Sequence, residues 1–193
     1  MIWRIEIKHK KGVFDACAQS IQKSILDLGL KEISKVEIVQ VYNIEGKLTA
    51  EDIQTVCRDL LVNSVTQEYD FTLQKYDPPA ISKKIHTIEI AYNPGVMEPV
   101  EESTIKGIRD LGIDHVDFVR TARKYLVYGS LTKKDIWTII NKVLSNKLIQ
   151  HVVDHSVLER SAANVLPAGG SFRLVLVDLL KAGDKQLMKI SSA

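Results

Sequence analysis

The sequence contains none of the short motifs that mark common enzyme sites. Its 193 residues hold no G-x-S-x-G, no Walker sequence and no G-x-G-x-x-G. No acylation triad can be assembled from the residue spacing. The paired acids Glu101 and Glu102 are expected on the solvated face of a helix. Taken alone, the chain offers no catalytic constellation, and we predict no catalytic residue on it.

Long hydrophobic runs and an excess of either charge are also missing. No run approaches the roughly 18 apolar residues that a membrane span needs, and the N-terminal segment has no apolar core of a signal peptide. The net charge is only +2, so no global field recruits nucleic acid or an acidic membrane. We therefore expect a cytoplasmic protein that binds neither.

The chain repeats itself with a constant offset of 83 residues. Gly95–Gly112, with the sequence GVMEPVEESTIKGIRDLG, follows the pattern of Gly12–Gly29, with the sequence GVFDACAQSIQKSILDLG. Of 70 pairs aligned in this register, 23 are identical, against roughly four expected by chance from ordinary composition. The sequence predicts a tandem duplication, with units at residues 1–75 and 85–155 and a tail at 156–193.

The duplication also limits thiol and metal chemistry. Cys17 and Cys57 align with aliphatic residues of the second copy, which indicates buried packing positions for both. His151 and His155 have the spacing of a helical metal pair. Their β-branched surroundings instead indicate a strand, along which they would lie roughly 13 Å apart. We predict no metal site and no cofactor site on this chain.

Hydrophobic periodicity assigns one element order to both copies. In the first copy, residues 2–9 alternate as a half-buried strand, and residues 15–28 carry a helical stripe. Residues 33–44 are typical of two short strands or one bent strand. A capping box at Thr49–Asp52 begins a second helix, and residues 65–73 are typical of a closing strand. Each unit is therefore expected to be a two-layer βαβ(β)αβ unit of the α+β class, with a mainly antiparallel sheet and helices on one face.

The most informative difference between the copies is a gain of positive charge. The second copy has Val119-Arg-Thr-Ala-Arg-Lys-Tyr125 where the first has Val36-Glu-Ile-Val-Gln-Val-Tyr42. One interpretation is a solvated strand edge that is protected against pairing. Another is a docking surface for an acidic partner or for phosphate groups. A third is a pair of RNA-recognition-like modules, for which only Tyr42 and Tyr125 stand near the required aromatic positions.

These residues resemble a known family. The pattern is Gly-Val-x-[Asp/Glu]-Pro, then Ile-x-x-Leu-Gly, then Val-Arg-x-x-[Arg/Lys]-x-Tyr and a late Asn. It is similar to the small PurS subunit of phosphoribosylformylglycinamidine synthase. The second copy carries the pattern best, whereas the first has Ala16 in place of the proline and Glu37 in place of the arginine. The residues of the second copy that match are Gly95, Val96, Glu98, Pro99, Leu111, Gly112, Val119, Arg120, Arg123, Tyr125 and Asn146.

The resemblance implies a function in complex assembly. The family's small subunit forms a homodimer that helps to bring together the synthetase and the glutaminase, the PurL-like and PurQ-like parts of this ATP-dependent, glutamine-using ligase of purine biosynthesis. Two fused copies would form a pseudo-dimer. ATP and Mg²⁺ would belong to the complete enzyme, and this chain alone would be non-catalytic. The partner-binding residues expected from the charge difference are Arg120, Arg123, Lys124 and Tyr125.

The C-terminal tail also carries a resemblance, and two other functions remain open for the chain. Residues 172–180 and 184–191 resemble the lead-in to a synthetase, and the helical pattern from Asp184 stops at the last residue, as in a chain cut from something longer. A regulatory module of two ACT-like domains would bind a small metabolite and melt at a higher temperature with it. An RNA-binding pair would show salt-sensitive binding to oligonucleotides.

Overall fold

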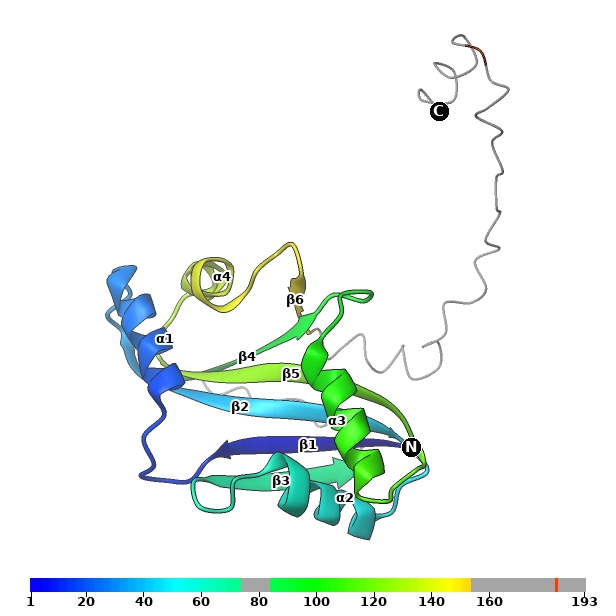
Figure 1. Cartoon of the computed structure of the whole chain (residues 1–193). Helices are drawn as coiled ribbons and strands as arrows, with labels where there is room; N and C mark the ends of the chain where they lie inside the picture. The colour runs from blue at the N-terminus through cyan, green and yellow to red at the C-terminus, as the bar shows by residue number, and fades with distance from the viewer. Residues whose placement is uncertain (74–83, 154–182, 184–193) are drawn as a thin grey trace. The chain divides into compact units, whose positions relative to one another are not determined.

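A computed structural model describes residues 1–73, 84–153 and 183 of this chain. Residues 1–155 form one compact unit. The described part is an α+β structure with six strands and four α-helices, two of which continue into a π-helical turn (Figure 1). In chain order the elements are β1 (Ile2–His9), α1 (Ala16–Asp27), β2 (Ile33–Gly46), α2 (Ala50–Val56), η1 (Cys57–Leu61), β3 (Gln67–Leu73), β4 (Ile85–Tyr92), α3 (Pro99–Asp110), β5 (Val116–Gly129), α4 (Lys133–Ile139), η2 (Ile140–Leu144) and β6 (Gln150–Val152).

All six strands belong to one antiparallel sheet with the order β3-β1-β2-β5-β4-β6. The two expected sheets are therefore wrong in number, although the α+β class and the antiparallel pairing are confirmed. Residues 33–46 form a single strand rather than two short ones. The sheet is continuous because β2 and β5, the long strands of the two halves, pair with each other at its centre.

The two halves are related by the same offset of 83 residues in structure as in sequence. Every element of the second half begins 83 residues after its counterpart in the first. At the centre of the β2–β5 ladder, Gln40 lies opposite Arg123, its own equivalent. On either side of this pair, Val39 lies opposite Lys124, the equivalent of Val41, and Val41 lies opposite Ala122, the equivalent of Val39. This is the register of two strands related by a two-fold axis.

Local sequence signals position the helices as the periodicity predicts. Asp15 begins α1 by accepting a hydrogen bond from the Ala18 N–H at 3.0 Å. Thr49 begins α2 with a complete capping box, in which the Thr49 hydroxyl oxygen accepts from the Asp52 N–H at 3.2 Å and the Asp52 carboxylate accepts from the Thr49 N–H at 2.8 Å. Gly29 follows α1 with φ at +85°, a left-handed conformation that glycine adopts without the steric cost of a Cβ.

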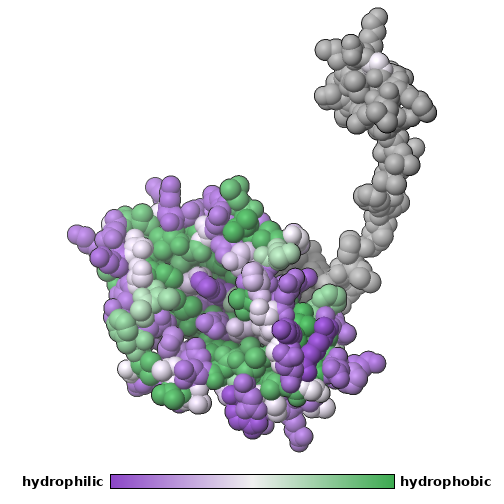
Figure 2. All heavy atoms as spheres, viewed as in Figure 1, coloured by the Kyte–Doolittle hydropathy of each residue, from purple (hydrophilic) through white to green (hydrophobic). Residues whose placement is uncertain are grey.

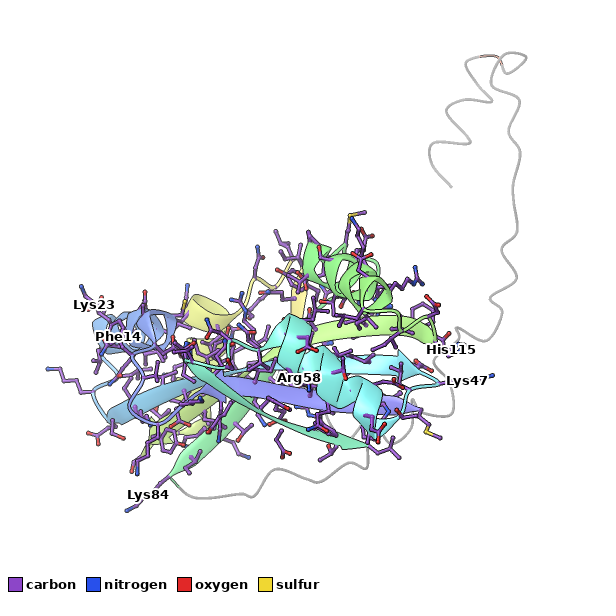
Figure 3. The ribbon with its side chains drawn as sticks, turned by 60° about the horizontal axis from the view of Figure 1, so that its bottom comes forward. Phe14, Lys23, Lys47, Arg58, Lys84 and His115 are labelled. Atoms are coloured by element: carbon purple, nitrogen blue, oxygen red, sulfur yellow. The ribbon has the colours of Figure 1, made fainter. Side chains whose placement is uncertain are left out.

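At one end of the sheet, the residue that follows β2 is hydrogen-bonded to the residue that precedes β5. Lys47 follows β2 and His115 precedes β5, and the Lys47 N–H donates to the His115 carbonyl at 3.0 Å. Figure 3 shows these two residues side by side at one end of the sheet, with Phe14, just before α1, at the other end. This hydrogen bond fixes the end of one half's long strand to the start of the other's.

Two hydrophobic cores fill the space between the sheet and the helices, and each core uses both halves. In one core, Ile108 of α3 packs with Ile5 and Ile7 of β1 and with Ile53 of α2. In the other, Ile25 of α1 packs among equivalent residues of the second half, which are Ile88, Ile90, Ile139 and Ile140. The first helix of each half therefore covers the core of the other half. A half without the other would lose one helix from its core.

The two cysteines have opposite environments. Cys57 is fully buried, as predicted, whereas Cys17 is exposed and the prediction of a buried packing position for it is wrong. Cys17 is an exposed residue of α1, and its aliphatic counterpart in α3, Val100, is exposed as well. Burial raises the pKa of the Cys57 thiol to about 12, so almost no thiolate forms there at neutral pH.

We therefore expect a thiol reagent to distinguish the two residues. At pH 8 the native protein should react rapidly with one equivalent of Ellman's reagent, at Cys17, and with a second only after denaturation. The Cys17→Ser variant should show no rapid phase. A rapid second equivalent in the native protein would contradict the burial of Cys57.

Candidate functional site

Strand β5 separates the four predicted partner-binding residues onto two faces of the sheet. Arg123 and Tyr125 face the helices, where both line a cavity and Tyr125 is buried. Lys124 occupies an alternate position of the strand and belongs to the opposite face. Arg120 also has the alternate position but lies where β5 is no longer paired with β4, and from this edge its side chain reaches Glu101 of α3. The structure does not bring the four together as one surface. The sequence alone could not show this separation. Residues alternate between the two faces only along one continuous strand, and the sequence left open whether this segment forms one strand or two.

Arg120 is exposed at the edge of the sheet. Its side chain is 70% exposed and donates to Glu101 of α3 at 2.9 Å. Glu101 also accepts the Thr121 N–H at 3.0 Å. Because its side chain is only 13% exposed, the prediction of a solvated face is wrong for Glu101, while Glu102 is exposed. Glu101 thus fixes the start of α3 to the β5 edge and holds Arg120 beside it.

Lys124 belongs to a cluster of four charged side chains on the face away from the helices. The cluster consists of Arg4, Glu6, Glu89 and Lys124. The Arg4 guanidinium donates to both oxygens of Glu89, at 3.1 and 2.7 Å, and to Glu6 at 2.9 Å. Lys124 donates to the other oxygen of Glu6. Two ion pairs therefore join the first half to the second.

The charges in this cluster stabilise one another. Burial by itself raises the pKa of Glu6, but the hydrogen bonds and charges of Lys124 and Arg4 outweigh it and hold that pKa below its usual range. Burial likewise opposes the charge on Arg4, yet Glu89 and Glu6 raise its pKa above the usual value. Glu6 and Arg4 therefore stay ionised at neutral pH. The cluster lies over the central strands, where Val41 is fully buried.

A cavity of about 540 Å³ opens on the face that bears the helices. Figure 2 shows hydrophobic and hydrophilic side chains intermixed over this face. The cavity lies over the centre of the sheet, between α1, the start of α3 and the end of η2. Its lining combines apolar residues with charged, phenolic and amide side chains, which are Glu98, Arg123, Tyr42, Tyr92, Tyr125, Gln40, Asn146 and Gln150.

Glu98 is the acidic group of this cavity and is 9% exposed. One carboxylate oxygen accepts the Val100 N–H at 3.3 Å, which caps α3, and the other accepts the Thr121 hydroxyl. Burial raises the pKa of Tyr42, with the charge of Glu98 acting in the same direction and that of Arg123 opposing it. Burial also raises the pKa of Tyr125, against the opposing effect of Arg123. Both phenols remain hydrogen-bond donors at neutral pH.

The remaining candidates from the sequence carry no site. Among the residues that the structure describes, no three His, Cys, Asp or Glu side chains are grouped to hold a metal ion. The His151 ring nitrogen Nδ1 lies 3.1 Å from the Asn93 side-chain oxygen. His155, the other histidine of the spacing noted in the sequence, falls outside the described residues. In the same part of the chain, no helix has the length and apolar character needed to cross a membrane.

The geometry is that of an α+β module in which two similar halves share one sheet. A family model described as PurS, phosphoribosylformylglycinamidine (FGAM) synthase, matches residues 2–75. The FGAM synthase subunit PurS of Methanocaldococcus jannaschii is 29% identical over 76 residues, 37% of this chain and 92% of the relative. That of Archaeoglobus fulgidus is 32% identical over 74 residues, 36% of this chain and 92% of the relative. Over its N-terminal part, the chain belongs to the PurS family of FGAM synthase, a family of purine biosynthesis.

The family match and the motif resemblance fall on different halves. The matched residues form the first half, β1 to β3, whereas the arginine and proline of the motif are in the second. Sequence reasoning also missed the pairing of Arg4 with Glu89 and the position of Glu98 in a cavity. The pairing of Arg4 with Glu89 had a signal in the sequence. The alternation of each first strand places Glu6 and its equivalent Glu89 on the polar face of its half.

Proposed function

We propose that this chain is the assembly portion of FGAM synthase, and that it holds the synthetase and glutaminase parts together for ammonia transfer. The observation that carries the proposal is the PurS match over a half that shares its sheet with a second half of the same element order. A second half in that position would replace the second subunit of a PurS homodimer. The chain would contribute no catalytic group, and ATP and Mg²⁺ would bind elsewhere in the complete enzyme.

The central register and the shared cores support the idea that the two halves form a pseudo-dimer after a tandem duplication. In an antiparallel pair of identical strands, a residue on the two-fold axis faces its own copy, as Gln40 faces Arg123. The exchange of α1 and α3 between the cores follows the same symmetry. Fusing two such subunits removes the translational entropy cost of dimerisation and allows the two copies to diverge.

That divergence supplies a distinct surface for each partner. Arg120 replaces Glu37 of the first half, so equivalent positions of the two halves carry opposite charges. We assign Arg120, with its exposed guanidinium, to a contact with an acidic patch of one partner. Lys124 and Tyr125 are enclosed by neighbouring side chains and would influence partner binding only through the fold. By holding both partners in register, the module would keep ammonia enclosed and away from water.

Changing Arg120 tests this assignment. We expect Arg120→Ala to weaken binding to the synthetase or glutaminase part by roughly 5–10-fold, since an exposed interface charge contributes modestly. Glutamine-dependent FGAM formation should fall with complex formation, while ammonia-dependent formation should be retained. Binding is measured by calorimetry on the purified parts, and synthesis by the rate of product formation.

Arg109→Ala is the matched control, because Arg109 is an exposed arginine of α3. It should leave both binding and synthesis unchanged. Equal binding by the Arg120→Ala and unmodified chains would refute the role of Arg120. Failure of the unmodified chain to bind either part would refute the proposed function itself.

A further inference from the structure

The cavity between α1, α3 and η2 is lined in part by residues of the second half that differ in type from their equivalents in the first half. Arg123 and Thr121 of the lining correspond to Gln40 and Ile38 of the first half. Glu98 corresponds to Asp15, whose carboxylate lies 3.2 Å from His9. The second half therefore has a cation and a hydroxyl at positions where the first has an amide and an aliphatic side chain. This cation and this hydroxyl are not required by the fold, because the first half forms the same elements without them.

Glu98 and Arg123 line this cavity without forming an ion pair with each other. No ion pair with an N–O distance within 4 Å joins Glu98 and Arg123, and neither belongs to any ion pair found between described residues. Both charges nevertheless act on the Tyr42 hydroxyl, from opposite signs. Both charged groups thus line the cavity together with the Tyr42 phenol, and they do not pair with each other.

The charges and the size of the cavity restrict what it accepts. A simple anion would meet the negative charge of Glu98, and a simple cation would meet the positive charge of Arg123. A molecule with both charges satisfies both groups. A guanidinium pairs with a carboxylate through two parallel hydrogen bonds. A carboxylate oxygen accepts more than one hydrogen bond, so Glu98 can receive an ammonium group while it caps α3.

We propose that this cavity binds a small zwitterion of the α-amino acid class, with its carboxylate on Arg123 and its ammonium group toward Glu98. The volume of about 540 Å³ lies within the range of small-molecule sites. The hydroxyls of Tyr42, Tyr92 and Tyr125 supply donors around the carboxylate, and Ile21 and Val143 supply apolar surface for a side chain. The site would add a ligand-dependent property to the assembly module and is independent of whether the module assembles FGAM synthase.

Thermal unfolding of the whole 193-residue chain with each of the twenty L-amino acids at 5 mM tests the proposal. We expect at least one amino acid to raise the melting temperature, by roughly 5–10 °C when its concentration is 100 times the Kd. Acetate and methylammonium at the same concentration, each carrying only one of the two charges, should have no such effect. Calorimetry with the best amino acid then gives the Kd.

Two variants taken from the first half of the chain locate the site. Arg123→Gln and Thr121→Ile each introduce the residue found at the equivalent position of the first half. Arg123→Gln should weaken amino-acid binding at least tenfold, and its melting temperature without ligand should be unchanged. Arg109→Ala should bind as the unmodified chain does. The proposal is overturned if no amino acid shifts the melting temperature by more than 1 °C, or if Arg123→Gln binds equally well. Binding of the same variants to the synthetase part is measured separately. A chain that binds the synthetase part but no amino acid would overturn this site and leave the proposed function standing.

Discussion

Replacing Arg4 with alanine is expected to lower the free energy of unfolding by about 3 kcal/mol. The Glu89 carboxylate, only 3% exposed, would lose both of its guanidinium hydrogen bonds in a region from which water is largely excluded. Glu6 would lose one of its two cationic partners in the same change. Urea denaturation followed by circular dichroism measures the effect.

Lys8→Ala is the matched control for this change, because Lys8 forms an ion pair with Glu68 in which both side chains are about half exposed. Exposed pairs contribute little, so the loss should stay below about 0.5 kcal/mol. An Arg4→Ala variant as stable as Lys8→Ala would mean that the cluster of four charges does not join the halves.

Replacing Ile25 or Ile108 with alanine should lower the free energy of unfolding by about 3 kcal/mol in each case. Both side chains are fully buried, and each packs in the core of the half to which it does not belong in sequence. Because the cores share the sheet and exchange helices, each variant should still unfold in one transition, at a lower urea concentration. Fluorescence and circular dichroism should follow the same curve.

Leu26→Ala supplies the comparison on the same helix. Leu26 neighbours Ile25 but is 38% exposed, so its loss should be below about 1 kcal/mol. Two separate transitions, of which Ile25→Ala shifts only one, would show that the halves unfold independently and would contradict the shared cores.

The elements of this fold could be predicted from the sequence because their signals are local. Asp15 and Thr49 each accept a hydrogen bond from a backbone N–H three residues further on, and Gly29 satisfies a single left-handed position. Such signals act within one helical turn, so they can be read without knowing the tertiary structure. The strand at residues 2–9 has the same property, since alternation records which residues face the core.

The arrangement of the halves could not be predicted in the same way. The pairing of Gln40 with Arg123 and the position of Ile25 in the second core depend on contacts between residues more than 60 apart, for which a sequence has no local signal. The cavity could not be predicted either, because Glu98 and Arg123 come to line one cavity only when β5 passes the start of α3. The charge gained at residues 120–124 falls on one strand, β5, whose edge and two faces separate the side chains that carry it.

Cleavage of the segment that joins the halves tests the central claim most directly. With a protease site inserted between Tyr76 and Lys84, the cut protein should elute from a size-exclusion column as one species that contains both fragments in equal amounts. It should keep the mass of about 22 kDa and unfold in one transition. If the fragments separated under native conditions, or if each formed dimers with itself, the halves would not share a sheet and cores, and the pseudo-dimer would be excluded.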